Sequence, residues 1–267
     1  MARKPPAAAP APPDPLFNQS LEKGLAVLRG FNARRRTMTL ADVAEAADIN
    51  KSSAQRMVYT LEQLGYLAKH AQTRRYQLTP RVMEIGFNYL AADALIDMAN
   101  PFLAELATAT GETCNLTEPL ASEMVYVARF VSAKFVPIHM PIGSRIPMYC
   151  TGAGRAFLSA LPEAEARQLL AAAPRVAHTR HTKTDVNEIM ALLRGARRQG
   201  YATNCEELFL GDMVVAAPII GAHGRPVAAV HVVAPTSRWS LKEAELRLAP
   251  AAIECARAIS TSVRALG

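Results

Sequence analysis

The chain has 267 residues, of which 50% are hydrophobic and 20% are charged, and its formal net charge at pH 7 is +7. This length predicts two modest domains, because one domain usually holds about 100–200 residues. The half-apolar composition excludes disorder for most of the chain, since it can bury enough surface to offset the entropy of ordering. A membrane-spanning helix is excluded too, because no stretch approaches the ~18 uncharged apolar residues that one requires.

Positive charge is concentrated in the first third of the chain. Residues 1–92 carry 13 Lys and Arg against 7 Asp and Glu, whereas residues 93–267 carry 17 against 16. This asymmetry indicates a polyanionic partner for the N-terminal part, either nucleic acid or an anionic membrane. Residues 1–17 are rich in Pro and Ala and predict a disordered leader without the apolar segment of a secretory signal. We therefore expect a cytoplasmic protein with reduced cysteines.

Three short helices are expected between residues 18 and 64. Ser20 is the candidate N-cap of the first helix, and Thr39 with Asp42 forms a capping box at the start of the second. The third helix runs from Lys51 to about Leu64 and ends at Gly65. Apolar residues at helical spacing predict the buried stripes of the first and third helices: Leu21, Leu25, Leu28 and Phe31, then Ala54, Met57, Val58, Leu61 and Leu64.

Two strands, residues 66–69 and 75–78, follow the third helix and are joined by a polar turn. Three helices and a basic hairpin predict a winged helix-turn-helix. The alternative is a small helical domain with an ordinary polar surface. The outward face of the third helix carries polar and cationic side chains that can reach base edges in the major groove: Lys51, Ser52, Gln55 and Arg56, with Ser53 beside them. Arg74 and Arg75 are placed on the wing for phosphate or minor-groove contacts.

A helix from Pro80 to about Ala92 is apolar almost all round. Such a helix must be buried, and at a domain junction the simplest cover is a second copy of the same helix. The pattern therefore favours a dimer.

From residue 96 onward helices and strands interleave without the regular repeat of a doubly wound sheet, which predicts an α+β fold with one antiparallel sheet. The expected helices are 98–110, 151–160, 163–172, 185–199 with Thr184 as cap, and 240–264. The expected strands are 114–117, 124–130, 135–140, 201–204, 213–219 and 227–233.

Several segments together resemble the IclR family of bacterial transcriptional regulators, over residues 18–265. They are Lys51-Ser52-Ser53-Ala54-Gln55-Arg56 through Leu64-Gly65-Tyr66-Leu67, Gly143-Ser144-Arg145-Ile146-Pro147, Thr151-Gly152-Ala153-Gly154-Arg155-Ala156, Gly200-Tyr201-Ala202 with Glu206-Glu207, Ala216-Ala217-Pro218-Ile219, and Gly224-Arg225-Pro226-Val227-Ala228-Ala229. No one segment is diagnostic, but their order and spacing across two domains are highly specific.

The resemblance implies a winged-helix DNA-binding domain at 18–79, a linker helix at 80–95 and a GAF-like α/β effector-binding domain at 96–267. It further implies a dimer or dimer of dimers on palindromic double-stranded operator DNA, controlled by a small organic acid or aromatic catabolite. The DNA-reading positions that match are those named above. The matching positions of the effector pocket are Gly152, Ala153, Asn204, Val214, His231 and Val233.

Three of these pocket positions suggest how an acid is bound. The backbone N–H groups of Gly152 and Ala153 lie at a helix N-terminus, which favours a carboxylate. His231 could add a cationic or hydrogen-bonding contact, because strand alternation puts it on one face with Ala229 and Val233. The alternative for His231 is a core histidine whose hydrogen bonds are satisfied.

Catalytic residues, cofactors and metal ions are not expected. His178 and His181 have the spacing of two metal ligands, but no cluster completes a tetrahedral site. Cys150 precedes a helix N-terminus that would stabilise a thiolate, so a GAF-like thiol redox sensor or enzyme is the alternative function. A peripheral membrane protein is disfavoured, because the basic N-terminal helices lack an aromatic and leucine-rich face.

Overall fold

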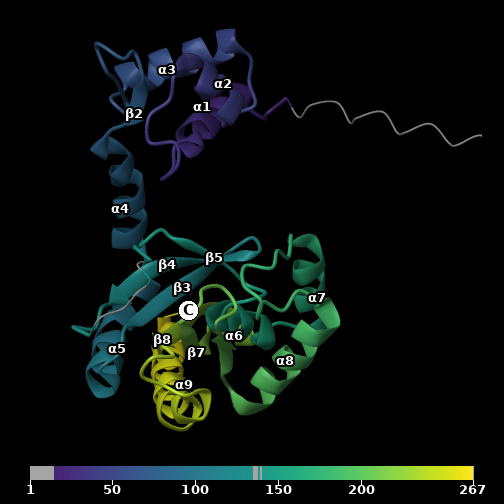
Figure 1. The fold of residues 1–267 in the computed structure, drawn as a ribbon. Helices are drawn as coiled ribbons and strands as arrows, with labels where there is room; N and C mark the ends of the chain where they lie inside the picture. The colour runs from purple at the N-terminus through teal and green to yellow at the C-terminus, as the bar shows by residue number, and fades with distance from the viewer. Residues whose placement is uncertain (1–14, 135–137, 139, 267) are drawn as a thin grey trace, which may run out of the picture. The chain divides into compact units, whose positions relative to one another are not determined.

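A computed structural model of the chain describes residues 15–134, 138 and 140–266. They divide into two compact units, the first ending at Tyr89 and the second beginning at Leu90. Figure 1 shows the helices and strands of each unit. Residues 1–14 of the expected leader, and positions 135–137 and 139 of the expected strand, lie outside the described residues. None of the described helices combines the length and apolarity that crossing a bilayer requires.

The first unit is a winged helix-turn-helix, as the sequence predicts. Its elements are α1 (Gln19–Gly30), α2 (Leu40–Ala46), α3 (Lys51–Gln63), β1 (Leu67–Lys69), β2 (Tyr76–Leu78) and a short 3-10 turn (Pro80–Val82), followed by α4 (Met83–Ala92), which crosses into the second unit. The strands β1 and β2 pair antiparallel to form the wing.

Side-chain caps fix where these helices begin. The predicted capping box of α2 is present, with Thr39 Oγ1 accepting the N–H of Asp42 and the Asp42 carboxylate accepting the N–H of Thr39. The predicted cap of α1 is wrong, because Asn18 rather than Ser20 accepts the backbone N–H groups of Ser20 and Leu21. Asn18, two residues earlier than the predicted cap, satisfies free N–H donors of the first turn.

The core of the first unit differs from the predicted stripe of α1. Leu21 and Leu25 are 62% and 44% exposed, whereas Val27 and Gly30 are buried. Gly30 lies so close to α2 that an added Cβ would be 3.2 Å from the Cβ of Ala46. This close packing of α1 on α2 turns Leu21 and Leu25 outward, whereas the other two predicted residues, Leu28 and Phe31, pack into the core. In α3 the stripe holds except at Leu64, which is 51% exposed.

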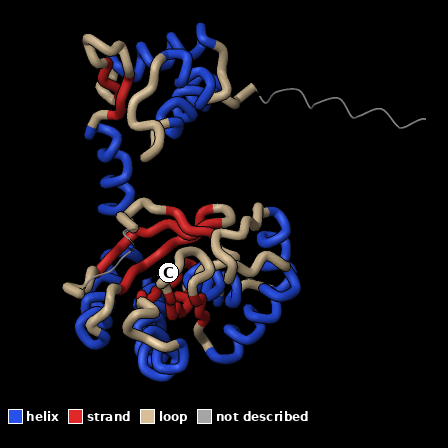
Figure 2. The backbone as a smooth tube through the Cα atoms, viewed as in Figure 1, coloured by secondary structure: helices blue, strands red, loops and turns tan. Residues whose placement is uncertain are grey.

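The second unit is built on one antiparallel six-stranded sheet, in agreement with the predicted fold class (Figure 2). The strand order is β5 (Arg145–Pro147), β4 (Glu123–Phe130), β3 (Cys114–Leu120), β8 (Pro226–Val233), β7 (Met213–Ile220) and β6 (Ala202–Cys205). The helices are α5 (Ala94–Thr110), α6 (Gly152–Ala160), α7 (Glu163–Ala172), α8 (Val186–Gln199) and α9 (Leu241–Leu266), with a 3-10 turn at Ala222–Gly224. The edge strand β5 is not predicted by the sequence.

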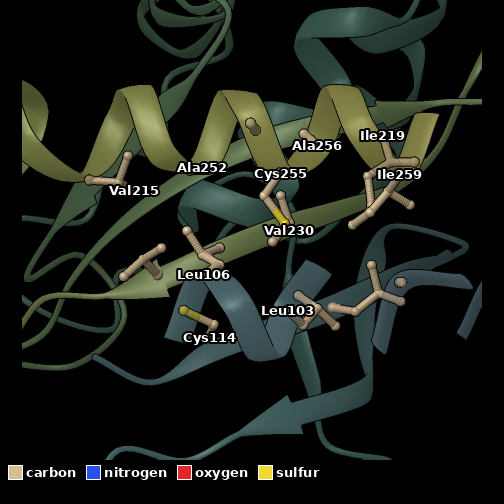
Figure 3. Close-up of a cluster of buried hydrophobic side chains, with 14 of the residues drawn as sticks. Leu103, Leu106, Cys114, Val215, Ile219, Val230, Ala252, Cys255, Ala256 and Ile259 are labelled. Carbon is tan, nitrogen blue, oxygen red and sulfur yellow. The ribbon is translucent and has the colours of Figure 1, made fainter. Parts of the chain in front are cut away.

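Two helices cover one face of this sheet and three cover the other. α5 and α9 pack on the first face, and Figure 3 shows the inner side of α9, at Cys255 and Ile259, close to Val230 and Ile219 of the strands. α6, α7 and α8 form the second core with the opposite face. The alternation of side chains along β7 divides its apolar residues between the two cores.

Acidic caps shift two helix starts from their predicted positions. α5 begins at Ala94 rather than Met98, because the Asp93 carboxylate accepts the N–H groups of Leu95 and Ile96. α8 is capped by Asp185 rather than Thr184, since Asp185 accepts the N–H of Glu188 at 2.9 Å. A carboxylate is favoured at these positions by the helix dipole.

Gly154 sets the position of α6, a helix whose first residues border a cavity. An added Cβ at this residue would lie 2.2 Å from Cα of Met148, closer than any real contact. The glycine-rich start of α6 therefore serves close packing of helix on backbone.

Candidate functional site

The exposed face of α3 carries the predicted DNA-reading side chains. Lys51, Ser52, Gln55 and Arg56 are exposed and Ser53 is half-buried. Asn50 caps the helix through the N–H of Ser53, at 2.8 Å, so the first turn that presents these groups is well defined.

The cations of this face have no acidic partner within the described part of the chain. Lys51 and Arg56 form no ion pair there, in contrast to Arg75, Arg194 and Arg225, which pair with carboxylates. Their charges are therefore available to an external polyanion.

The two wing arginines have different surroundings. Arg74 lies in the turn with a left-handed φ of 58° and an exposed side chain. Arg75 instead binds back onto α2, donating from Nε and Nη2 to Thr37 at 2.9 Å and from Nη2 to Asp42 at 3.1 Å. The pKa of Asp42 is lowered, first by its hydrogen bonds to Thr39 and then by Arg75. Arg75 thus ties the wing to the helix-turn-helix, with a side chain still 39% exposed.

A cavity of the second unit brings together all six predicted effector positions. It lies between the start of α6 and the facing strands, and its empty space is about 500 Å³, open solvent at the mouth included. Its lining contains Gly152, Ala153, Asn204, Val214, His231 and Val233, together with Asn115, Tyr126, Arg129, Ile138, Met140, Ile146, Thr151, Leu208, Phe209 and Asp212.

The N-terminus of α6 is partly satisfied within the protein. Gly152 N–H donates to Asn204 Oδ1 at 2.7 Å, so one of the two backbone donors expected to hold a carboxylate already has an amide oxygen as its partner. The second donor, Ala153 N–H, belongs to the first turn of the helix, whose N–H groups have no acceptor within the helix itself.

His231 is a buried, neutral histidine with one nitrogen unpartnered. Burial, reinforced by the charge of Arg129, lowers its pKa to about 3, which favours the hydrogen-bonding contact over the cationic one expected from the sequence. Its Nε2 lies 3.1 Å from Asn115 Nδ2, and its ring meets Tyr126 edge-on with centroids 5.3 Å apart. Nδ1 has no hydrogen-bond partner among the described residues. The alternative of a fully satisfied core histidine therefore does not hold.

Arg129 and Asn115 line the cavity but are not predicted from the sequence. Strict alternation from Tyr126 would put Arg129 on the opposite face of β4. The pairing of β3 with β4 shifts, however, from Leu116↔Ala128 to Thr117↔Tyr126, which leaves Val127 as the extra residue of a β-bulge. Bulges re-aim the side chains that follow them, and this one returns Arg129 to the face of Tyr126. No local sequence signal marks it.

Asp212 contributes a carboxyl group to the same cavity. Burial raises its pKa from an ordinary 3.8 to about 6. The folded protein thus binds this proton more tightly than the unfolded chain. Asp212 therefore contributes stability that is fully present below pH 3.8 and is lost as the pH rises through about 6.

We compare the free energy of unfolding of Asp212→Asn with that of the wild-type protein at each pH. The difference in favour of the variant is expected to be about 2 kcal/mol larger at pH 8 than at pH 4, because each tenfold change in proton affinity corresponds to about 1.4 kcal/mol. Unfolding curves of both proteins at the two pH values measure this difference. Asp97→Asn, on an exposed position of α5, controls for the substitution itself. An equal effect of Asp212→Asn at both pH values would contradict the buried-carboxyl interpretation.

A buried ion pair connects two segments that line the cavity. Arg155 of α6 donates from Nη1 and Nη2 to the two carboxylate oxygens of Glu207, at 2.5 and 2.6 Å. Arg155 Nε also donates to Tyr149 O, and Lys183 N–H donates to Glu207. The pair joins the helix that starts at the cavity to the segment that supplies Leu208, Phe209 and Asp212, a link that sequence reasoning did not predict.

Cys150 lacks the properties of a reactive thiol. It is fully buried, and burial raises its pKa to about 12, so the predicted stabilisation of a thiolate by the following helix is wrong. All four cysteines are free thiols. Desolvation outweighs the helix dipole here because the sulfur is far from water.

The two loop histidines have protein partners rather than a metal site. His178 stacks on Tyr149 with ring centroids 6.2 Å apart, and His181 Nε2 lies 3.6 Å from a Glu206 oxygen. Among the residues that the structure describes, no group of three or more His, Cys, Asp or Glu could hold a metal ion.

Two family models match the two units. The model described as the IclR helix-turn-helix domain matches residues 20–71, and that described as the bacterial transcriptional regulator IclR C-terminal matches residues 87–261. The Pca regulon regulatory protein of Pseudomonas putida is 31% identical over 245 residues, covering 91% of this chain and 84% of the relative.

Solved structures agree with this match. An IclR transcriptional regulator from Alicyclobacillus acidocaldarius is 27% identical with a TM-score of 0.80, covering 92% of this chain and 98% of the other. An IclR homologue from Microbacterium hydrocarbonoxydans, complexed with 4-hydroxybenzoate, shares the fold with a TM-score of 0.74 at 23% identity, covering 92% and 100%. The named relatives are regulators and not enzymes. The chain, matched by both models of the family along most of its length, therefore belongs to the IclR family of bacterial transcriptional regulators.

Proposed function

We propose that this IclR-type regulator changes its affinity for operator DNA when a small organic acid or aromatic catabolite binds in the cavity of the second unit. The observation that carries the proposal is the cavity itself, in which all six predicted effector positions meet. A ligand there can act on DNA binding only through its different affinities for the DNA-competent and DNA-incompetent arrangements.

The proposed DNA-binding domain is residues 18–79, with residues 80–95 as linker helix and 96–267 as effector domain. The N-terminal half of α3 enters the major groove, where Lys51, Gln55 and Arg56 read base edges and Ser52 and Ser53 add short polar contacts. Arg74 contacts phosphate or the minor groove from the wing. Arg75 reaches the same backbone while holding α2 in place.

A dimer, or a dimer of dimers, is proposed from the exposed apolar side chains of α4. Met83, Ile85, Phe87 and Tyr89 are 70%, 58%, 68% and 49% exposed. Apolar side chains exposed all round a helix are unusual, and a second copy of α4 offers a matching apolar surface to cover them. Two paired chains also suit a palindromic operator, since each half-site takes one recognition helix.

The double variant Ile85→Glu/Phe87→Glu is expected to be monomeric, because burial of each such side chain is worth about 1.5–3 kcal/mol and would be lost in both copies. Sedimentation or light scattering measures the mass. Asn88→Glu adds a charge at an exposed polar position of the same helix and is the matched control, expected to stay dimeric. A double variant with unchanged mass would show that α4 is not the dimer contact.

The proposed effector carries a carboxylate. Support comes from the free N–H of the first turn of α6, from Arg129 in the cavity lining, and from the neighbour of the same fold that holds 4-hydroxybenzoate.

Selection of genomic DNA fragments by the purified protein at two salt concentrations tests the DNA-binding part. A few palindromic sites that survive the higher salt would support specific recognition. Uniform recovery that collapses with salt would reduce the interaction to phosphate contacts and overturn the proposal.

A further inference from the structure

A polar row crosses the three central strands on the cavity side of the sheet. The strand register places Arg129 of β4 opposite Asn115 of β3, and Asn115 opposite His231 of β8. All three residues line the cavity. A row of this kind in the middle of a sheet is unusual, because such positions are normally apolar.

The row contains buried polar atoms without partners at both ends, and Asn115 Oδ1 between them has none among the described residues either. The assigned orientation of the Asn115 amide places Nδ2 beside His231 Nε2, and with this assignment Nε2 accepts and the neutral ring carries its proton on Nδ1. Neither this Nδ1 nor Arg129 Nε, which is also buried, has a hydrogen-bond partner among the described residues. Burying a donor without an acceptor is costly, so a ligand that brings acceptor atoms to this row would be stabilised there.

The charge of Arg129 is likewise uncompensated within the described chain. Its Nη1 donates to the backbone oxygen of Met140, and Arg129 forms no ion pair among the described residues. Asp212, the carboxyl group of the cavity, has its pKa raised by burial alone, with no lowering by Arg129. A partly buried guanidinium without a counter-ion favours an anionic ligand.

We propose that Arg129 and His231 together bind the oxyanion of the effector, so that its acid group lies against the central strands rather than at Gly152 N–H. The inference rests on the proposed function of the cavity as an effector site. Arg129 supplies charge and the Nε donor, and His231 supplies a neutral second donor at the other end of the row. Gly152 N–H is not needed, because Asn204 Oδ1 already occupies it.

The probes are three acids, each paired with its neutral amide: acetate with acetamide, benzoate with benzamide, and 4-hydroxybenzoate with 4-hydroxybenzamide. Thermal shift of the full-length protein ranks them, and calorimetry gives affinities for the best pair. The expected result is stabilisation by at least one acid and at least tenfold weaker binding of its amide, since hydrogen bonds to charged groups are the stronger ones.

Arg129→Gln is expected to lower the affinity for the acid about tenfold or more while changing that for the amide less than about threefold. Arg145→Gln is the matched control, because Arg145 is 52% exposed and pairs with Glu123 on the edge strands. Arg129→Lys keeps the charge but loses the Nε donor, and His231→Gln moves the second donor, so both should weaken acid binding as well. These two variants test the inference if Arg129→Gln is poorly folded.

Each of the remaining outcomes refutes one part of the proposal. Acid binding that survives all three cavity variants, or amide binding equal to acid binding, would refute the role of Arg129 and His231 and leave the cavity as an effector site. No stabilisation of the wild-type protein by any acid would refute the acid effector and this inference together. Selective operator binding would still stand as a separate result.

Discussion

Glu207→Ala is expected to lower the free energy of unfolding of the second unit by about 3–5 kcal/mol, the typical cost of breaking a buried pair from one side. The side chains of Arg155 and Glu207 are only 3% and 5% exposed. Removal of the carboxylate leaves the guanidinium buried without its counter-ion, and Lys183 N–H without an acceptor. Trp239, the one tryptophan of the chain, lies in the second unit, so its fluorescence during denaturant unfolding reports this change.

Glu163→Ala is the matched control for Glu207→Ala. Glu163 pairs with Arg194 at 2.8 Å, but both side chains are about half exposed, so its loss should cost no more than about 1 kcal/mol. A Glu207→Ala variant no less stable than this control would mean that water reaches the Arg155 guanidinium. Glu207→Ala is also expected to disturb the cavity, because the segment after Glu207 supplies part of its lining.

Arg56→Ala is expected to weaken specific operator binding by about 1–3 kcal/mol for each recognition helix, the range for a bidentate contact to a base. Binding to a scrambled duplex should change much less. Arg198→Ala removes the same charge from an exposed position of α8 in the second unit and controls for net charge. Titrations of both variants on the selected and scrambled duplexes, at one salt concentration, measure the effect.

Equal small losses on both duplexes would assign Arg56 a phosphate contact rather than base recognition. The slope of affinity against salt then gives an independent check, since loss of one phosphate contact lowers it by about one.

The fold could be predicted where local chemistry decides it. The capping box at Thr39 and the turn at Gly65 place helix ends correctly, because each satisfies free backbone groups within a few residues. The prediction failed where packing decides. The outward rotation of Leu21 depends on the close approach of α1 to α2, and β5 exists because β4 offers it an edge.

The cavity, too, could be predicted from the sequence only in part. Its six predicted positions follow from resemblance to a family, and they meet in space. Arg129 could not be predicted, because the bulge at Val127 is a property of the pairing between β3 and β4 and reverses the expected face. The behaviour of Cys150 could not be predicted either, since its pKa is set by burial under neighbouring elements rather than by its place before a helix.

We propose that a ligand in the second unit controls DNA binding by the first. The most direct measurement is the affinity of the wild-type protein and of Arg129→Gln for one selected operator, with and without the best acid probe. We predict a change of about 5–150-fold in the wild-type protein, the usual range of allosteric coupling, and little change in the variant. An acid that binds the wild-type protein tightly yet leaves its operator affinity unchanged would contradict the account.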